Sequence, residues 1–285
     1  MKHNALRSLI IVIALGLALS SLGVSGAQST ADSRIISAPA QVIELQPDNA
    51  TPSAAPCSAP GDAAKALQCL KDGNVRWQKT ALCSDGKCSG QTEMIARNWP
   101  EQRRETAPPP ATNKQHPFAV VLSCMDSRVP PELIFDQGLG DLFVIRVAGP
   151  VLNNDELASL EFALRVYGVR LILVLGHTDC GAVKGAVEDA TGTFLPTLLD
   201  KLEPAITVVS REYNGGTRIT ASQPITPREQ ANLDRVSLVN ARLVSSQIRE
   251  KRAWLRSGIK GLQVKWGLYY LASGQVAFDP TNLEK

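Results

Sequence analysis

Two short segments of this chain combine cysteine, histidine and charged side chains. The first is Cys124-Met125-Asp126-Ser127-Arg128, and the second is His177-Thr178-Asp179-Cys180-Gly181. Two thiolates and one imidazole, from Cys124, His177 and Cys180, would bind zinc and leave its fourth coordination position open. Sulfur ligands combined with imidazole favour zinc over magnesium or calcium. The two segments therefore predict a zinc site, provided that the fold brings them together.

Each of these residues also has a purely structural interpretation. Free cysteine is among the most buried residue types, so Cys124 taken alone is more often part of a core than a ligand. A single histidine after a strand, such as His177, is equally ambiguous. Asp126 and Arg128 could be a simple ion pair within a loop, or the guanidinium could hold the carboxylate in a fixed orientation beside a metal. The joint placement of all these residues favours the metal site.

Three continuous apolar runs precede or separate the two segments, at residues 118–122, 142–145 and 171–175. Runs rich in branched residues and without alternation are typical of strands buried on both faces of a parallel sheet. Cys124 and His177 each stand two residues beyond the end of such a run. Ligands of open parallel sheets bind outside the carboxyl ends of the strands. If the first and third runs are neighbours, the candidate ligands therefore meet there.

Helical patterns alternate with these runs. Residues 62–79 read as an N-terminal helical arm, and Asn153 with Glu156 forms a capping box for a second helix. Thr226-Pro227-Arg228-Glu229 opens a long helix toward Ser257, and residues 262–270 and 276–278 resemble closing strands. Cys180 is expected in the first turn of another helix, where the helix dipole favours a thiolate. The alternation predicts an α/β fold with a central, mostly parallel sheet flanked by helices.

The composition fits one globular domain and excludes several other classes. The chain has 285 residues, of which 44% are hydrophobic and 20% charged, and its formal net charge is +3. These values exclude a disordered chain or a coiled coil. The small net charge and the lack of a Lys/Arg run argue against a nucleic-acid partner.

The N-terminus resembles an export signal. Basic residues at Lys2 and Arg7 precede an apolar run from Leu9 to Leu19, and small residues follow before position 28. We expect residues 1–27 to be a cleaved signal peptide, although a retained membrane anchor is the alternative. Residues 28–60 then form a flexible leader, and residues 61–285 a single catalytic domain. With no second apolar segment, we expect no stable membrane insertion after cleavage, and a location in the periplasm or outside the cell.

The two ligand-bearing segments resemble the signature of the β-class carbonic anhydrases, Cys-x-Asp-Ser-Arg followed by His-x-x-Cys-Gly. The blocks at 136–146 and 176–183 match other well-known blocks of that family, and Leu67-x-x-Leu70-x-x-Gly73-Asn74 resembles its first core helix. The likeness extends from about Ala66 to Phe278. It implies the β-carbonic anhydrase-like fold and places nearly the whole expected domain in one family.

The resemblance implies reversible hydration of carbon dioxide to bicarbonate and a proton, with one zinc ion per subunit. Cys124, His177 and Cys180 would be the zinc ligands. Asp126 would be either a fourth ligand or, held by Arg128, the group that orients the water activated by zinc. The family forms dimers or dimers of dimers, so a homodimer or homotetramer is expected.

The resemblance also implies a substrate-binding set. Gln115 would reach across a dimer interface to hydrogen-bond the substrate, although its residue type alone suggests a solvated loop position. Phe143 and Phe162 would line an apolar slot for carbon dioxide, and Gly181 completes the set. One family branch binds an inhibitory bicarbonate beside a tryptophan at the position that is Val121 here, so that regulatory site is not expected.

Four cysteines remain outside the predicted zinc site: Cys57, Cys69, Cys83 and Cys88. In an exported protein an even number suggests disulfides, and we expect Cys83–Cys88 and Cys57–Cys69. A second metal site and a free buried thiol at Cys69 are the alternatives.

Three other functions remain open from the sequence. Carbon disulfide or carbonyl sulfide hydrolysis at the same site is the enzymatic alternative. A non-catalytic zinc- or bicarbonate-binding protein is the second alternative. A redox sensor that uses Cys124 and Cys180 is the third.

Overall fold

The computed structural model describes residues 61–81, 115–255 and 259–280. All of them belong to one compact unit, Pro47–Lys285. The expected signal peptide (1–27) and leader (28–60) lie outside the described residues, so these boundaries and the single domain at 61–285 stay predictions. Within the described part of the chain, no helix combines the length and apolar character needed to cross a membrane.

The centre of the fold is one five-stranded sheet with the strand order β2-β1-β3-β4-β5. Its strands are β1 (Ala119–Ser123), β2 (Leu142–Arg146), β3 (Leu171–His177), β4 (Gln263–Tyr270) and β5 (Gln275–Phe278). The first four run parallel, and β5 pairs antiparallel with β4. The predicted α/β fold with a mostly parallel sheet is confirmed. The expected neighbourhood of the first and third apolar runs is also confirmed, because β1 pairs directly with β3.

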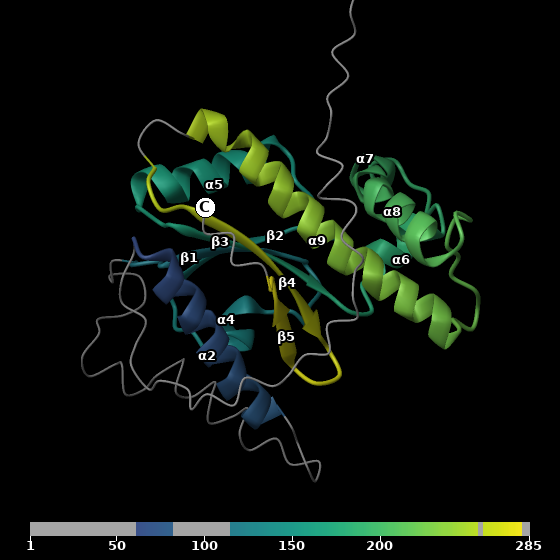
Figure 1. Ribbon diagram of the computed structural model, residues 1–285, viewed down its shortest axis with the longest axis horizontal. Coiled ribbons are helices and arrows are strands. Elements are labelled where there is room, and N and C mark those ends of the chain that lie inside the picture. The colour runs from purple at the N-terminus through teal and green to yellow at the C-terminus, as the bar shows by residue number, and fades with distance from the viewer. Residues whose placement is uncertain (1–60, 82–114, 256–258, 281–285) are drawn as a thin grey trace, which may run out of the picture. The chain divides into compact units, whose positions relative to one another are not determined.

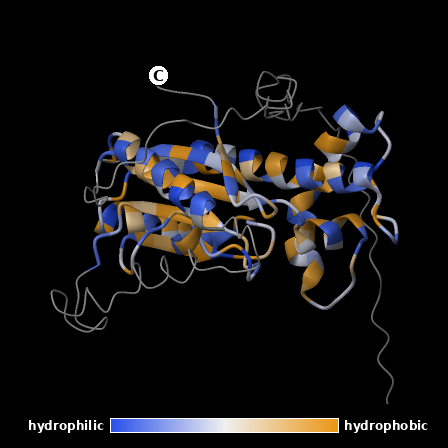
Figure 2. Ribbon diagram, turned by 90° about the horizontal axis from the view of Figure 1, so that it is seen from below, coloured by the Kyte–Doolittle hydropathy of each residue, from blue (hydrophilic) through white to orange (hydrophobic). Residues whose placement is uncertain are grey.

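The two central strands explain why the sequence pattern was continuous rather than alternating. Every residue of β1 and of β3 is buried, because helices cover both faces of the sheet. Figure 1 shows α2 and α4 on one face and α5 and α9 on the other. In Figure 2 the strands are mostly orange, whereas the helices alternate between orange and blue, as expected for helices with one apolar side.

The N-terminal arm is helix α2 (Ala63–Ala81), close to the predicted range. Asp62 begins it, because its Oδ1 accepts hydrogen bonds from the backbone N–H groups of Ala64 and Lys65, both at 3.1 Å. The helix packs on the sheet together with the short helix α4 (Pro131–Ile134). This close approach requires a glycine at Gly73, where a Cβ atom would lie 1.7 Å from the carbonyl oxygen of Phe135.

Two capped helices cover the opposite face. The capping box of Asn153 and Glu156 begins α5 (Asn154–Val166), as predicted. Helix α9 (Pro227–Leu255) begins at the second predicted capping box. There the Thr226 backbone N–H donates to Glu229 at 2.9 Å, and the Glu229 N–H donates back to the Thr226 hydroxyl at 3.3 Å.

A group of short helices packs beside α9: α6 (Gly181–Val187), α7 (Leu195–Leu199), the 3₁₀ turn η1 (Asp200–Leu202) and α8 (Glu203–Tyr213). The sequence pattern did not predict α4, α7, η1 or α8. The buried side chains of α6, α7, η1 and α8 form one hydrophobic cluster with the side of α9 that faces them, and Cys124 and Cys180 belong to the same cluster. The candidate ligands therefore sit where the parallel sheet meets this helical cluster.

Candidate metal centre

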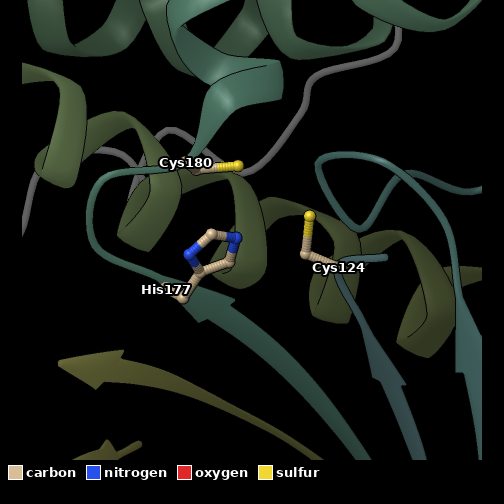
Figure 3. A group of neighbouring side chains, drawn as sticks. All are labelled: Cys124, His177 and Cys180. Atoms are coloured by element: carbon tan, nitrogen blue, oxygen red, sulfur yellow. The ribbon is translucent and has the colours of Figure 1, made fainter. Parts of the chain in front are cut away.

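The structure brings Cys124, His177 and Cys180 together. Their ligand atoms, two Sγ atoms and one imidazole nitrogen, all lie within 4.8 Å of one another, and all three side chains are buried. Figure 3 shows both sulfurs and the ring grouped around a common point. These three residues form a group that can hold a metal ion.

Each candidate ligand is positioned by the end of a secondary-structure element. Cys124 follows β1 directly, and His177 is the last residue of β3. Both strands therefore extend slightly further than the apolar runs suggested. Cys180 is the N-cap of α6 rather than a residue of its first turn, so this detail of the prediction was wrong. Because β1 and β3 are parallel neighbours, their carboxyl ends place the ligands at the same edge of the sheet.

The imidazole of His177 has one nitrogen left to bind something. Its Nδ1 lies 2.8 Å from the carbonyl oxygen of Thr178, so Nδ1 carries the proton and donates it. Its Nε2 is buried and has no hydrogen-bond partner. A buried nitrogen with a free lone pair beside two sulfurs fits a metal ligand.

The end of β4 fixes the carbonyl that orients this imidazole. The backbone N–H of Thr178 donates to the carbonyl oxygen of Tyr269 at 3.0 Å. The N–H of Leu271 donates to the Thr178 hydroxyl at 3.1 Å. These two bonds hold Thr178 in place and thereby hold the ring of His177 toward the sulfurs.

The two cysteines form one electrostatic pair. The pKa of the Cys124 thiol is well below its usual value because the Cys180 thiol donates a hydrogen bond to its thiolate. The pKa of Cys180 is raised, first by that neighbouring thiolate and then by burial. The backbone N–H of Gly149 also donates to Cys124 Sγ, at 3.4 Å. A bound cation would relieve the mutual repulsion that keeps the second proton on this pair.

Asp126 and Arg128 form a two-pronged ion pair beside this group. Arg128 Nε donates to Asp126 Oδ1 at 3.0 Å and Nη2 donates to Oδ2 at 2.8 Å. The hydrogen bonds from Arg128 hold the pKa of Asp126 at about 2. Asp126 Oδ2 lies 4.0 Å from Nε2 of His177. Of the two positions left open by the sequence, the structure therefore has Asp126 on Arg128.

Arg146 supports the loop that carries these residues. Its Nε donates to the carbonyl oxygen of Cys124 at 3.1 Å, and its Nη2 donates to that of Asp126 at 2.5 Å. Arg146 ends β2 and thereby fixes the backbone on both sides of Met125.

The expected substrate-binding residues do not all reach the metal group of the same chain. Gln115 Nε2 donates to the Tyr167 hydroxyl at 2.7 Å. Phe143 and Phe162 pack against the ring of Tyr167, with centroids 4.9 Å and 5.6 Å away. Phe143 pairs with Val120 in the sheet, four residues before Cys124. At roughly 3.3 Å per residue, Phe143 therefore lies about 13 Å from Cys124 along the strand direction.

Gly181 does lie at the group, directly after Cys180. A Cβ atom at this position would meet nothing within 4 Å. The first residue of α6 therefore borders open space next to one of the candidate ligands.

Sequence reasoning missed three residues that shape the site: Gly149, Tyr167 and Asp179. Asp179 Oδ2 accepts a hydrogen bond from Arg128 Nη1 at 2.9 Å. The position of Asp179 between two candidate ligands was the one signal in the sequence that could have identified it. No spacing rule predicts that it accepts a hydrogen bond from Arg128, which is far away along the chain. Gly149 and Tyr167 carry no such signal.

The structure also bears on the remaining cysteines. Cys69 is disulfide-bonded, so the alternative of a free thiol there was wrong. Cys57, Cys83 and Cys88 lie outside the described residues, and both expected pairings therefore stay predictions. Among the described residues, Cys124 and Cys180 are free.

Comparisons with known proteins place the chain in a family. A sequence model of the family described as carbonic anhydrase matches residues 119–276, more than half of the chain. The chain is 39% identical to a carbonic anhydrase of Mycolicibacterium smegmatis over 146 residues, which cover 50% of this chain and 63% of that protein. It is 45% identical to carbonic anhydrase 2 of Mycobacterium tuberculosis over 103 residues, 34% of this chain and 50% of that protein. The matched part thus spans less than two thirds of either relative.

The fold agrees with this assignment. A tetrameric β-carbonic anhydrase of Sordaria macrospora superposes with a TM-score of 0.53 at 22% identity, over 68% of this chain and 98% of that one. Taken together, the matching family model, the curated relatives and the shared fold show that this chain belongs to the β-class carbonic anhydrase family.

Proposed function

We propose that this protein catalyses the reversible hydration of carbon dioxide to bicarbonate and a proton, using zinc. The observation that carries the proposal is the convergence of Cys124, His177 and Cys180 beside a carboxylate that Arg128 holds in place. The names of the relatives support it.

The chemistry of the three side chains favours zinc as the metal. Two thiolates and an imidazole are ligands that zinc prefers, and three protein ligands leave a position open for water. Zinc bound there would act as a Lewis acid that lowers the pKa of that water.

Asp126 then serves as the acceptor that orients the water. Both of its oxygens accept hydrogen bonds from Arg128, so the carboxylate stays ionised and points in one direction. An ionised carboxylate accepts a hydrogen bond from water and turns a lone pair of that water toward the substrate carbon. Arg128 thereby keeps Asp126 available as an acceptor.

We further propose that the enzyme is a homodimer or homotetramer whose sites are completed by a second copy. Gln115, Phe143 and Phe162 lie together but away from the ligands of their own chain. Phe143 belongs to strand β2, which is at the edge of the sheet, and Gln115 and Phe162 meet it through Tyr167. Phe162 is 52% exposed and Val166, on the same helix, is 63% exposed. Exposed apolar side chains beside an open sheet edge favour association with another copy.

We also propose that the protein acts after export, in the periplasm or outside the cell. The N-terminal pattern of basic, apolar and small residues supports this location. The disulfide at Cys69 supports an oxidising compartment as well. Mass spectrometry of the protein purified from the cell envelope would show a chain that begins near Gln28, and an intact N-terminus would contradict the proposal.

The catalytic proposal is tested by comparing substrates on one zinc-loaded sample of the full chain. Stopped-flow measurements with a pH indicator would follow carbon dioxide hydration, and sulfide release would follow hydrolysis of carbonyl sulfide and carbon disulfide. We expect rapid hydration of carbon dioxide and little sulfide. Sulfide release without hydration would replace the proposal by the hydrolase alternative, and neither reaction would point to a binding protein.

A further inference from the structure

Arg128 makes more contacts than the ion pair with Asp126 requires. Its Nη1 donates to Asp179 Oδ2 at 2.9 Å, and its Nη2 donates to the backbone carbonyl of Asp179 at 3.1 Å. Asp179 lies between His177 and Cys180, whereas Arg128 lies in the loop of Cys124. These two hydrogen bonds therefore join the two segments that carry the candidate ligands.

Asp179 is itself held in place from the long helix α9. Its backbone N–H donates to Asp234 Oδ1 at 2.8 Å. The Gln230 side chain, one turn earlier on α9, donates to the same oxygen at 2.9 Å. Asp179 has a φ of +54°, a left-handed conformation that aspartate, asparagine and glycine tolerate better than other residues. The backbone of Asp179 is thus held in place, and its carboxylate points toward Arg128.

Neither ion pair of Arg128 is fully buried: the side chains of Arg128, Asp126 and Asp179 are 49%, 16% and 62% exposed. An exposed ion pair between two side chains contributes little free energy by itself, because ordering long side chains costs entropy and water screens the charges. A guanidinium that is bonded on Nε, Nη1 and Nη2 to acceptors from two segments has far less freedom.

We propose that Asp179 is a positioning residue, which fixes the guanidinium of Arg128 and, through it, the direction of the Asp126 carboxylate. The inference deepens the proposed hydration activity and rests on it wherever turnover is measured. It assigns Asp179 no contact with substrate. Asp234 acts one step further away by holding the Asp179 backbone.

Substitutions of Asp179 can separate its hydrogen bond from its backbone conformation. Asp179→Gly keeps a residue that tolerates the positive φ but removes the carboxylate that accepts from Nη1, while the backbone carbonyl that accepts from Nη2 remains. Asp179→Asn keeps both the conformation and one side-chain oxygen that can accept from Nη1. The matched control is Asp189→Gly, since Asp189 also has a positive φ (+51°) and also pairs with an arginine, Arg218, at 3.3 Å.

Two readouts are needed, one of which does not depend on activity. The first is the rate at which phenylglyoxal modifies Arg128, followed by peptide mass spectrometry on zinc-free and zinc-loaded full-length protein. The second is kcat/KM for carbon dioxide hydration. We expect Asp179→Gly to label several times faster at Arg128 and to lose about tenfold in kcat/KM, the low end for a residue that supports a metal site. Asp179→Asn should show smaller changes in both, and Asp189→Gly none.

The outcomes separate this inference from the proposed function. Unchanged labelling of Arg128 in Asp179→Gly would overturn the inference, whatever the activity. Faster labelling with unchanged kcat/KM in an active enzyme would overturn it too. If wild-type protein hydrates no carbon dioxide, the proposed function fails, while the labelling still decides whether Asp179 holds Arg128. Should the glycine variant not fold, Asp179→Asn, which keeps an acceptor oxygen but loses its charge, is compared with wild type, and equal labelling of Arg128 in the two would overturn the inference.

Discussion

At the scale of single residues, the centre is defined by which atoms already have partners and which do not. Asp126 has both oxygens bonded to Arg128, whereas Nε2 of His177 is buried with none. The first arrangement preserves a fixed, ionised acceptor, and the second leaves a lone pair for a metal. A substitution of the acceptor should therefore affect catalysis, whereas a substitution of a candidate metal ligand should affect zinc binding.

Asp126→Asn should retain zinc and lose most of the hydration activity. The amide offers one acceptor oxygen instead of two and cannot form the same ion pair with Arg128. We expect kcat/KM to fall by about 10- to 100-fold, measured by stopped flow with zinc determined on the same sample. Asp189→Asn serves as the control. Turnover equal to wild type would remove Asp126 from the mechanism.

Cys180→Ser should instead weaken zinc binding. A hydroxyl is a harder ligand than a thiol and keeps its proton at neutral pH, so the site loses one soft anionic donor. We expect the zinc dissociation constant to rise by more than about tenfold, measured by competition with a chromophoric chelator. Affinity equal to wild type in a folded variant would exclude Cys180 as a ligand.

At the scale of helices and strands, two close contacts hold the scaffold of the site together. Helix α2 reaches the sheet only because Gly73 lets it approach the carbonyl of Phe135. Helix α9 starts at a capping box whose Glu229 also accepts hydrogen bonds from Ser222, so that carboxylate ties the preceding loop to the helix. Each contact gives a stability prediction.

Gly73→Ala should destabilise the fold by about 3 kcal/mol, because the added methyl group overlaps backbone atoms that cannot move without separating α2 from α4. The matched control is Gly185→Ala, in which the new methyl group would meet its nearest neighbour at an ordinary 3.7 Å. Urea unfolding curves of both variants test this contrast. A loss in Gly73→Ala no larger than that in Gly185→Ala would contradict the close packing of α2.

Glu229→Gln should lower stability at neutral pH and have less effect in acid. Hydrogen bonds from Ser222 first, and then from Thr226, lower the pKa of Glu229 from 4.5 to about 2 in the folded protein. A lowered folded-state pKa means that the stabilisation is present above the unfolded value and is lost as the pH falls through the folded one. The difference in unfolding free energy between wild type and variant should therefore shrink as the pH falls from 4.5 toward 2.

The same Glu→Gln substitution at Glu250, an exposed position on α9, provides the control for this measurement. Glu250→Gln should not reproduce the pH-dependent loss. A Glu229→Gln difference that stays constant or grows in acid would show that the hydrogen bonds to the ionised carboxylate do not carry the effect.

The elements also show what a sequence can predict and what it cannot. The central strands and both capping boxes were predictable, because continuous apolar runs and the Asn153/Glu156 and Thr226/Glu229 pairs are local signals. Helices α4, α7 and α8 were not, because α4 and α7 are only four and five residues long and all three pack by burial against distant elements. Residue spacing likewise suggested the three candidate ligands. It could not reveal the contact between Arg128 and Asp179, because that contact depends on how two distant segments meet in the fold.

At the scale of the whole molecule, one chain does not bring all the expected site residues together. The candidate ligands lie at the carboxyl ends of β1 and β3, whereas Gln115 and Phe143 lie beside Tyr167, near the other end of β2. Residue spacing alone could not show this separation, because it depends on the register of β1 with β2, although the family resemblance implied that Gln115 reaches across a dimer interface. The proposed second copy accounts for it.

Val166→Asp should separate the copies and reduce activity while zinc binding remains. Val166 is exposed on α5 beside the sheet edge, and a carboxylate there would be buried without a partner in an apolar interface. Sedimentation equilibrium should show a monomer, with Thr193→Asp, at an exposed site before α7, as the control. An active monomer of the Val166 variant would contradict a site shared between copies.

The most informative measurement is a zinc titration of the metal-free protein, with carbon dioxide hydration followed by stopped flow after each addition. Activity should rise linearly and level off at one zinc ion per chain, and Cys180→Ser should need a much higher concentration of free zinc. Full zinc binding without hydration would contradict the proposed catalytic role of this centre. Hydration by protein that retains no metal would exclude the centre as its source.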